Sequence, residues 1–288
     1  SWKKLAYTIR TAIRFLDTVL TVNSYPIPEC KEVAEKSRRI GLGVTGLHYL
    51  LIKLGYRYGD SKCLEFIERL FATFRNEAYL ASIDLAEEKG SFPEFDAEKY
   101  CNSDFIKQIP TRIQSKIRKS GIRNAVMLTV APCGTSSMVL GVSSGLEPIF
   151  ATTYERSYRD GNIWNTELLA DKMFAEYHIA GKDTSHFVGA HDVSVEQHIA
   201  MQATIQKYID SAISKTTNIP EDFPVDQLSD VVLEYANFVK GFTIYRTGSR
   251  GLEPLKPVKL TGEKLDSICV SAISTATSDS CKSGVCDI

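Results

Sequence analysis

Hydrophobic side chains recur at three- and four-residue intervals along much of the chain, which is the period of an amphipathic helix. The pattern is clearest over residues 2–20 and 61–89, where one face of each stretch is apolar. Asp60 or Ser61 suits the N-cap of the second helix, and Gly90 suits its end. The same period predicts four further helices, over residues 47–54, 164–178, 194–215 and 226–240.

Two short apolar runs have a different character. Residues 125–131 (AVMLTVA) lie between Asn124 and Pro132 and are partly β-branched, and residues 241–245 (GFTIY) form a second run. Runs of this length predict strands that are buried on both faces, as in parallel sheets. Long helices that alternate with short buried strands predict an α/β fold.

The last part of the chain differs in composition. Aromatic side chains are absent beyond about residue 255, and residues 267–283 hold eight Ser or Thr in seventeen positions. Such a composition buries little apolar surface. We therefore expect a folded body over residues 1–252 and a mobile tail over residues 253–288.

Composition and charge exclude several classes of protein. Thirty-four Lys and Arg against thirty-five Asp and Glu give a net charge of −1, which disfavours a broadly basic nucleic-acid binder. No apolar run approaches the roughly 20 residues that span a bilayer, and no signal peptide is evident. The seven cysteines, an odd number, fit a reducing cytoplasm better than a secreted disulfide scaffold. Because the chain begins at Ser1, we expect a processed product or part of a longer polypeptide.

The segment from Val130 to Met138 (VAPCGTSSM) is the most suggestive for chemistry, because a loop of small residues directly follows a predicted strand. Such a loop exposes several backbone N–H groups which, with Thr and Ser hydroxyls, suit a phosphate. It lacks the Gly-Lys-Ser/Thr ending of a Walker loop. A tight turn without a ligand is the alternative. Cys133 is also a candidate nucleophile if the fold brings one of four histidines to it; these are His48, His186, His191 and His198.

Cys281 and Cys286 lie together near the C-terminus. An extended chain would hold their Cα atoms about 17 Å apart, whereas bridged Cα atoms usually lie about 4.4–6.8 Å apart. Ser283 and Gly284 could supply the turn that a disulfide needs. An exposed pair of this kind would be easily reduced and reoxidised. Half of a metal site or two idle thiols are the alternatives, and two thiols alone predict no metal site.

Other candidates carry less information. Glu147 follows the small-residue loop and could accept a hydrogen bond from a hydroxyl, pair with a cation or cap a helix. His191 and Asp192 are adjacent, as imidazole and carboxylate groups often are on surfaces. Three polar residues follow the second predicted strand and could contact a phosphate or water; these are Arg246, Ser249 and Arg250.

Taken together, several segments resemble the large chains of ribonucleotide reductases, and most closely the adenosylcobalamin-dependent (class II) subgroup. The resemblance runs from about residue 2 to residue 250, and the order of the segments makes it far more specific than any one of them. The segments are residues 39–47 (RIGLGVTGL), 131–137 (APCGTSS), 141–150 (GVSSGLEPIF), 190–192 (AHD), 198–203 (HIAMQA), 206–210 (QKYID), 214–220 (SKTTNIP) and 241–250 (GFTIYRTGSR).

The resemblance implies a fold and two sites. The chain would be the C-terminal half of a ten-stranded α/β barrel, a five-stranded half-barrel with surrounding helices, followed by the tail. Cys281 and Cys286 would form a redox pair that shuttles electrons and is recharged by thioredoxin or glutaredoxin. The family usually has Thr at position 133, so one hydroxyl is missing here. The substrate phosphates would be held by Pro132, Cys133, Gly134, Thr135 and Ser136.

The resemblance also implies an activity and the parts that it requires. The enzyme would convert ribonucleotides to deoxyribonucleotides by radical chemistry with adenosylcobalamin as cofactor. No segment here matches the loop that carries the radical cysteine, so the N-terminal half, as a separate chain or a removed part, would be an obligatory partner. The reductase could form a homodimer, and we expect no membrane partner. Either ribonucleoside diphosphates or ribonucleoside triphosphates could be the substrates.

Three other interpretations stay open. A metal-radical (class I) large-chain fragment can share the cysteine tail, but that class has adjacent tyrosines near the last strand, whereas the strand at residues 242–246 has Tyr245 alone. A non-catalytic half-barrel that binds a nucleotide or a partner chain is the second. A different enzyme with Cys133 as its nucleophile is the third.

Overall fold

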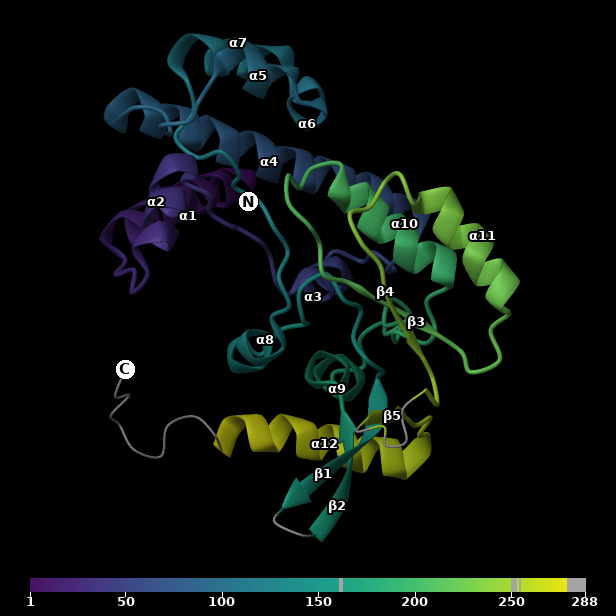
Figure 1. Cartoon of the computed structure of the whole chain (residues 1–288). Helices are drawn as coiled ribbons and strands as arrows, with labels where there is room; N and C mark the ends of the chain where they lie inside the picture. Colours follow the sequence, from purple (N-terminus) through teal and green to yellow (C-terminus); the bar gives the residue numbers. More distant parts are fainter. Residues whose placement is uncertain (161–162, 250–252, 254, 279–288) are drawn as a thin grey trace.

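A computed structural model describes residues 1–160, 163–249, 253 and 255–278 (Figure 1). The two longest helices, α1 (Trp2–Val22) and α4 (Ser61–Lys89), pack side by side and supply much of the main hydrophobic core. The hydrophobic period predicts both, and α4 has Asp60 as its N-cap and Gly90 as its C-cap, as expected.

Shorter helices surround this pair. The predicted buried helix near residue 50 is confirmed as α3. The helix predicted over residues 194–215 ends at Gln206, whose side-chain amide donates to Ile209 O at 2.9 Å and to Ser211 O at 2.8 Å, where the chain turns into an extended segment. The shorter helices are α2 (Pro28–Ser37), α3 (Leu47–Lys53), α5 (Ala97–Asn102), α6 (Asp104–Lys107), α7 (Thr111–Ser120), α8 (Gly134–Leu140), α9 (Lys172–Ile179), α10 (Val195–Gln206), α11 (Val225–Tyr235) and α12 (Gly262–Ser278).

Extended segments from distant parts of the chain pair in parallel, as the alternation of helices and buried runs predicts. Residues 40–42 pair with residues 126–129, with Leu42 N donating to Met127 O at 2.8 Å. The latter segment pairs on its other side with residues 211–214, where Val130 N donates to Ala212 O at 3.2 Å.

The extended chain then continues as β3 (Thr216–Ile219), which pairs in parallel with β4 (Thr243–Arg246). Of the two predicted strands, the second is therefore confirmed as β4. Residues 125–131 form isolated bridges at Leu128 and Val130 rather than a regular strand. A regular five-stranded half-barrel is not present in the described part of the chain, although the parallel direction of these segments is that of the predicted fold.

The prediction of a helix over residues 164–178 is wrong for the first half of that range. Residues 163–170 form β2 (Ile163–Ala170), which pairs antiparallel with β1 (Thr153–Asp160). Cross-strand pairs stabilise this hairpin, such as Arg156 and Glu167, whose charged groups lie 2.6 Å apart. The helix begins only after Asp171, because the Asp171 side chain accepts a hydrogen bond from Phe174 N at 3.0 Å and caps α9.

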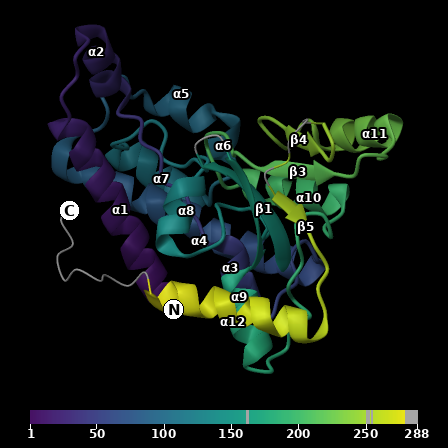
Figure 2. The same ribbon diagram turned by 90° about the horizontal axis from the view of Figure 1, so that it is seen from below.

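The expectation of a mobile tail from residue 253 is wrong for residues 255–278. Residues 255–257 form β5 (Leu255–Pro257), which pairs antiparallel with β1, so the expected boundary lies within one folded unit. Helix α12 packs on α9 and β2, and both views show it beside α9 (Figures 1 and 2). Its apolar side chains recur at helical spacing within the Ser/Thr-rich sequence, at Leu265, Ile268, Cys269, Ala272 and Ile273.

Two of the site predictions concern residues beyond this helix. Cys281 and Cys286 lie outside the described residues. The five cysteines that the structure does describe are free thiols, and three of them, Cys63, Cys101 and Cys269, are buried. Within the described ranges, no helix is long and apolar enough to cross a membrane.

Candidate functional site

The small-residue loop leads directly into α8. Cys133 is the N-cap, with φ −135° and ψ 39°, and Ser137 N donates to Cys133 O at 2.9 Å. Thr135 and Ser136 are exposed, and so are Pro132 and Gly134. The first N–H groups of a helix have no acceptor within it. The loop therefore presents N–H groups and two hydroxyls together on an open surface.

The Cys133 side chain is turned away from that surface. Its Sγ donates to Thr45 Oγ1 at 3.3 Å and lies 4.0 Å from Ser144 Oγ. Thr45 Oγ1 in turn accepts a hydrogen bond from Gly145 N at 3.0 Å, which ties residues 45–46 to residues 143–145. Within the described residues, the thiol thus bonds to hydroxyls rather than to a histidine, and nothing in this geometry activates it as a nucleophile.

A cavity of about 530 Å³ adjoins the loop. Gly134 and Ser137 form part of its wall, together with residues from α3, β1, β3, β5 and the connecting segments. Its size is that of ordinary small-molecule sites. Other polar residues at the wall are Tyr49, Ser143, Ser144, Glu147, Tyr154, Arg156, Asp171, Thr216 and Asn218.

Two carboxyl groups of this wall are held by defined partners. Asp171 Oδ2 accepts a hydrogen bond from the Tyr49 hydroxyl at 2.7 Å, and burial raises the pKa of Asp171. Glu147 accepts from Thr216 N at 2.6 Å, and its other oxygen lies 3.4 Å from Lys215 Nζ. Of the roles considered for Glu147, the structure therefore shows the pairing with a cation. Sequence reasoning did not identify Lys215, because 68 residues separate the two side chains.

The other candidate residues have structural partners. Asp192 Oδ2 accepts from Gly189 N at 3.1 Å, while the His191 ring packs edge-on against Phe150, so the adjacent pair does not form an acid–base dyad. Arg246 Nη2 donates to Phe223 O at 2.5 Å, which ties β4 to the start of α11. Arg250 lies outside the described residues.

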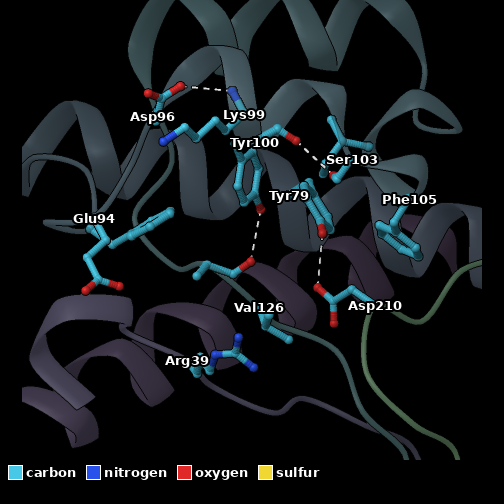
Figure 3. A pocket seen from close by; sticks show the side chains of 13 residues that line it. Arg39, Tyr79, Glu94, Asp96, Lys99, Tyr100, Ser103, Phe105, Val126 and Asp210 are labelled. Carbon is cyan, nitrogen blue, oxygen red and sulfur yellow. Dashed lines mark hydrogen bonds between the residues drawn. The ribbon is translucent and has the colours of Figure 1, made fainter. Parts of the chain in front are cut away.

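A second cavity, of about 420 Å³, is lined by residues of α4, α5 and α6 and by Asp210 (Figure 3). Figure 3 shows the Tyr79 hydroxyl pointing at Asp210, to which it donates at 3.0 Å. The same carboxylate accepts from Met127 N at 2.9 Å and from Leu128 N at 2.8 Å. Asp210 therefore fixes the extended segment that precedes the loop, which is a structural role. No group of three or more His, Cys, Asp or Glu side chains among the described residues could hold a metal ion.

Comparison with known proteins gives the family. A sequence model described as "Ribonucleotide reductase, barrel domain" matches residues 1–245. The chain belongs to the ribonucleotide reductase family. This confirms the predicted family, and the extended segments and the loop described above lie within the matched barrel domain or at its end.

Two relatives are named for the cofactor on which they depend. The reductase chain is 33% identical to a vitamin B12-dependent ribonucleoside-diphosphate reductase of Mycobacterium tuberculosis, over 86% of this chain and 37% of that protein. It is 32% identical to a protein of the same name from Thermoplasma acidophilum, over 88% of this chain and 34% of that protein. A ribonucleoside-diphosphate reductase subunit alpha of Treponema pallidum is 28% identical over 87% of this chain and 29% of its own length. The chain spans about a third of the length of these curated relatives.

Proposed function

We propose that this chain is the part of an adenosylcobalamin-dependent ribonucleotide reductase that binds the substrate phosphates and relays reducing equivalents. One observation carries the proposal: in a chain of the reductase family, residues 132–136 form an exposed turn of small residues at the start of α8, beside a cavity of about 530 Å³. The relatives named for vitamin B12 support the cobalamin class.

The phosphates would be bound mainly by backbone groups. The N–H groups of Gly134, Thr135 and Ser136 begin α8 and lack acceptors within it, so they can donate to phosphate oxygens. The hydroxyls of Thr135 and Ser136 add two further donors. The Cys133 thiol is bonded to Thr45 and contributes no hydroxyl where the family usually has Thr, so the loop relies on its backbone at that position.

The rest of the reductase would complete the barrel. The parallel segments at residues 40–42, 126–130 and 211–219, with β4, are the arrangement expected of a C-terminal half-barrel, and the N-terminal half would cover the edge at residues 40–42. Adenosylcobalamin supplies radical chemistry when it is bound. The cavity beside the loop has the size of a nucleotide site rather than of a corrinoid site. We therefore assign the cofactor no contact in this chain.

The tail cysteines would return electrons after each turnover. Reduction of one ribonucleotide oxidises two thiols of the active site to a disulfide. The Cys281–Cys286 dithiol would reduce that disulfide by thiol–disulfide exchange and would itself become a disulfide. The dithiol of thioredoxin or glutaredoxin would then reduce the tail pair, so electrons and protons balance over the cycle.

The relay is tested by separating one turnover from many. With the remainder of the reductase, adenosylcobalamin and a ribonucleotide present, a Cys281→Ser/Cys286→Ser double variant should complete a single turnover and lose thioredoxin-supported multiple turnover. Cys30→Ser, which changes an exposed thiol on α2, should behave as the wild type. Unchanged multiple turnover in the double variant would remove the relay from the proposal.

The same assay decides between the alternatives. Turnover that needs a metal-radical subunit instead of adenosylcobalamin would assign the chain to class I, and nucleotide binding without any turnover would favour a non-catalytic half-barrel. Cys133→Ser should retain turnover and change mainly the affinity for substrate. Loss of all turnover in that variant would support the nucleophile interpretation instead.

A further inference from the structure

The wall of the cavity beside the loop is fixed from behind by buried side chains. Residues 147–151, directly after Leu146, form this part of the wall. The Tyr58 hydroxyl donates to Leu146 O at 2.6 Å, and His48 Nδ1 accepts from Ile149 N at 2.9 Å. Both side chains are almost fully buried, at 1% and 0% exposure. The backbone on either side of Glu147 is therefore held in one place.

A buried ammonium group lies behind Glu147. Lys215, which precedes β3, is only 1% exposed. Its Nζ lies 2.8 Å from His198 Nδ1, 2.9 Å from Thr216 O and 3.4 Å from Glu147 Oε2. An ammonium has three protons to donate, so these three acceptors satisfy it fully.

The histidine in this group is a neutral acceptor. His198 Nε2 lies 2.9 Å from Ala190 O, which places the ring proton on Nε2 and leaves the lone pair of Nδ1 for Lys215. Burial, together with the nearby Lys215 ammonium, lowers the pKa of His198 to about 3. The Glu147 carboxylate is thus the only anion that the described contacts give to Lys215.

Mutual dependence links Lys215 and Glu147. Burial lowers the pKa of Lys215, while the Glu147 carboxylate raises it. A buried charge without a partner is strongly destabilising, so Lys215 requires this carboxylate in this position. In return, Lys215 Nζ and Thr216 N together fix both carboxylate oxygens.

The remaining lone pairs of Glu147 are available to a ligand. The side chain keeps 28% of its surface exposed and lies in the wall of the same cavity as Gly134 and Ser137 of the phosphate loop. An ionised carboxylate has about four acceptor positions, and the two bonds from the protein occupy two of them. A group that donates a hydrogen bond, without a charge of its own, would satisfy the rest.

We propose that Glu147 is a substrate-positioning residue that accepts a hydrogen bond from a hydroxyl or amino group of the bound nucleotide, and that Lys215 orients its carboxylate. The inference rests on the proposed function and adds a second contact to it. Residues 132–136 hold the phosphate end, and Glu147 holds the nucleoside end. The donor is a sugar hydroxyl or an exocyclic amine of the base, which share the same hydrogen-bonding chemistry.

A binding assay with three ligands distinguishes contacts to the phosphates, to the sugar hydroxyls and to the base amine. The assay uses the native reductase, with the rest of the enzyme present. Inorganic pyrophosphate offers phosphates alone, UDP adds sugar hydroxyls, and CDP adds an exocyclic amine. Glu147→Gln places an amide that can donate toward the cavity, and it should weaken nucleotide binding about tenfold or more. Pyrophosphate binding should stay within about twofold. Equal losses for UDP and CDP identify a sugar hydroxyl, and a loss for CDP alone identifies the base amine.

Two further variants guard against a folding defect. Glu147→Asp keeps a carboxylate at this position but shortens the side chain by one methylene, and it should show the same selective loss of nucleotide affinity. Lys215→Met should weaken nucleotide binding through Glu147, so the Lys215→Met/Glu147→Gln double variant should bind no more weakly than Glu147→Gln alone. Additive losses would remove Lys215 from the proposal.

The outcomes test the role of Glu147 separately from the proposed function. Wild-type nucleotide binding that Glu147→Gln and Glu147→Asp leave unchanged would overturn the role of Glu147 and leave the phosphate loop standing. A wild-type protein that binds neither pyrophosphate nor nucleotide would overturn the proposed function itself. Loss of pyrophosphate binding in step with nucleotide binding would show that Glu147 acts on the phosphate loop and not on the nucleoside.

Discussion

Asp17, on α1, is a fully buried carboxylate among cationic side chains. Its Oδ1 lies 2.7 Å from Arg38 Nη2 and 3.3 Å from Arg123 Nε, and its Oδ2 lies 3.4 Å from Lys89 Nζ. Burial alone would raise the pKa of Asp17, but the bond and charge of Arg38, with Arg123, hold it below the usual value. The cluster joins α1, through Asp17, to the end of α4, through Lys89. Arg38, after α2, and Arg123, after α7, tie two connecting segments to the same carboxylate.

Removing this anion should destabilise the protein strongly. Asp17→Asn leaves buried and half-buried cations without their partner, which typically costs about 3–5 kcal/mol. Asp84→Asn is the matched control, because Asp84 pairs with Arg10 at 2.9 Å but is 47% exposed, and it should cost at most about 1 kcal/mol. Urea unfolding measures both. Equal, small losses would show that the buried cluster contributes no more than a surface pair.

Some residues of the candidate site could be predicted from the sequence, and others could not. The five loop residues are consecutive, so a phosphate loop can be proposed from the sequence alone. The pairing of Glu147 with Lys215 joins positions 68 residues apart, and only the fold brings them together. The resemblance covered the segment around Lys215 but gave that residue no role.

Among the elements, α12 shows how composition can hide a helix. Averaged over residues 267–283, the Ser and Thr content predicts a mobile tail, whereas Leu265, Ile268, Cys269 and Ala272 form one apolar face that packs on α9 and β2. Long helices such as α1 and α4 are predictable because their period is sustained over many turns. The apolar residues of the β1–β2 hairpin fit a helical period over a short range, and the cap at Asp171 decides where the helix begins.

The docking of α12 can be tested with neighbouring positions of one helix. Cys269 is fully buried, whereas Val270 is 54% exposed. Cys269→Asp would bury a carboxylate without a partner, so it should release α12 and speed amide hydrogen exchange over residues 262–278. Val270→Asp should leave exchange unchanged. Rapid exchange of this segment in the wild type would show that α12 is not docked.

For the molecule as a whole, buried neutral histidines link stability to pH. Burial lowers the pKa of His48 to about 3, and burial with Lys215 lowers that of His198 to about 3. The unfolded chain binds protons at these residues near pH 6.5, and the folded chain does so only near pH 3. Stability from these groups is therefore complete above about pH 6.5 and is lost as the pH falls toward 3.

The loss of stability at low pH can be assigned to one histidine. Between pH 7.5 and pH 5, His48 alone should remove about 2 kcal/mol of the free energy of unfolding. His48→Gln cannot be protonated in this range, so its stability should fall by about 2 kcal/mol less than that of the wild type over the same interval. Identical pH dependence of the two proteins, measured by urea unfolding, would show that His48 is not buried in its neutral form.

At this scale the chain corresponds to one part of its longer relatives. It spans about a third of its relatives' length, and the family match and the parallel segments together indicate the reductase barrel. The sequence predicted the family and the parallel direction of the segments. It did not predict which short runs pair as regular strands, because that depends on contacts between distant segments.

The central claim is that the loop at residues 132–136 binds the substrate phosphates, and one binding measurement tests it most directly. Apart from the adjoining residues and the backbone of the same helix, no atom lies within 4 Å of the position that a Cβ would take at Gly134 or at Gly241, so an added Cβ would point into open space at either place. In the native reductase, Gly134→Val should obstruct the phosphates and weaken ribonucleoside diphosphate binding at least about tenfold, and Gly241→Val should bind as the wild type does. Unchanged binding by Gly134→Val would contradict the account.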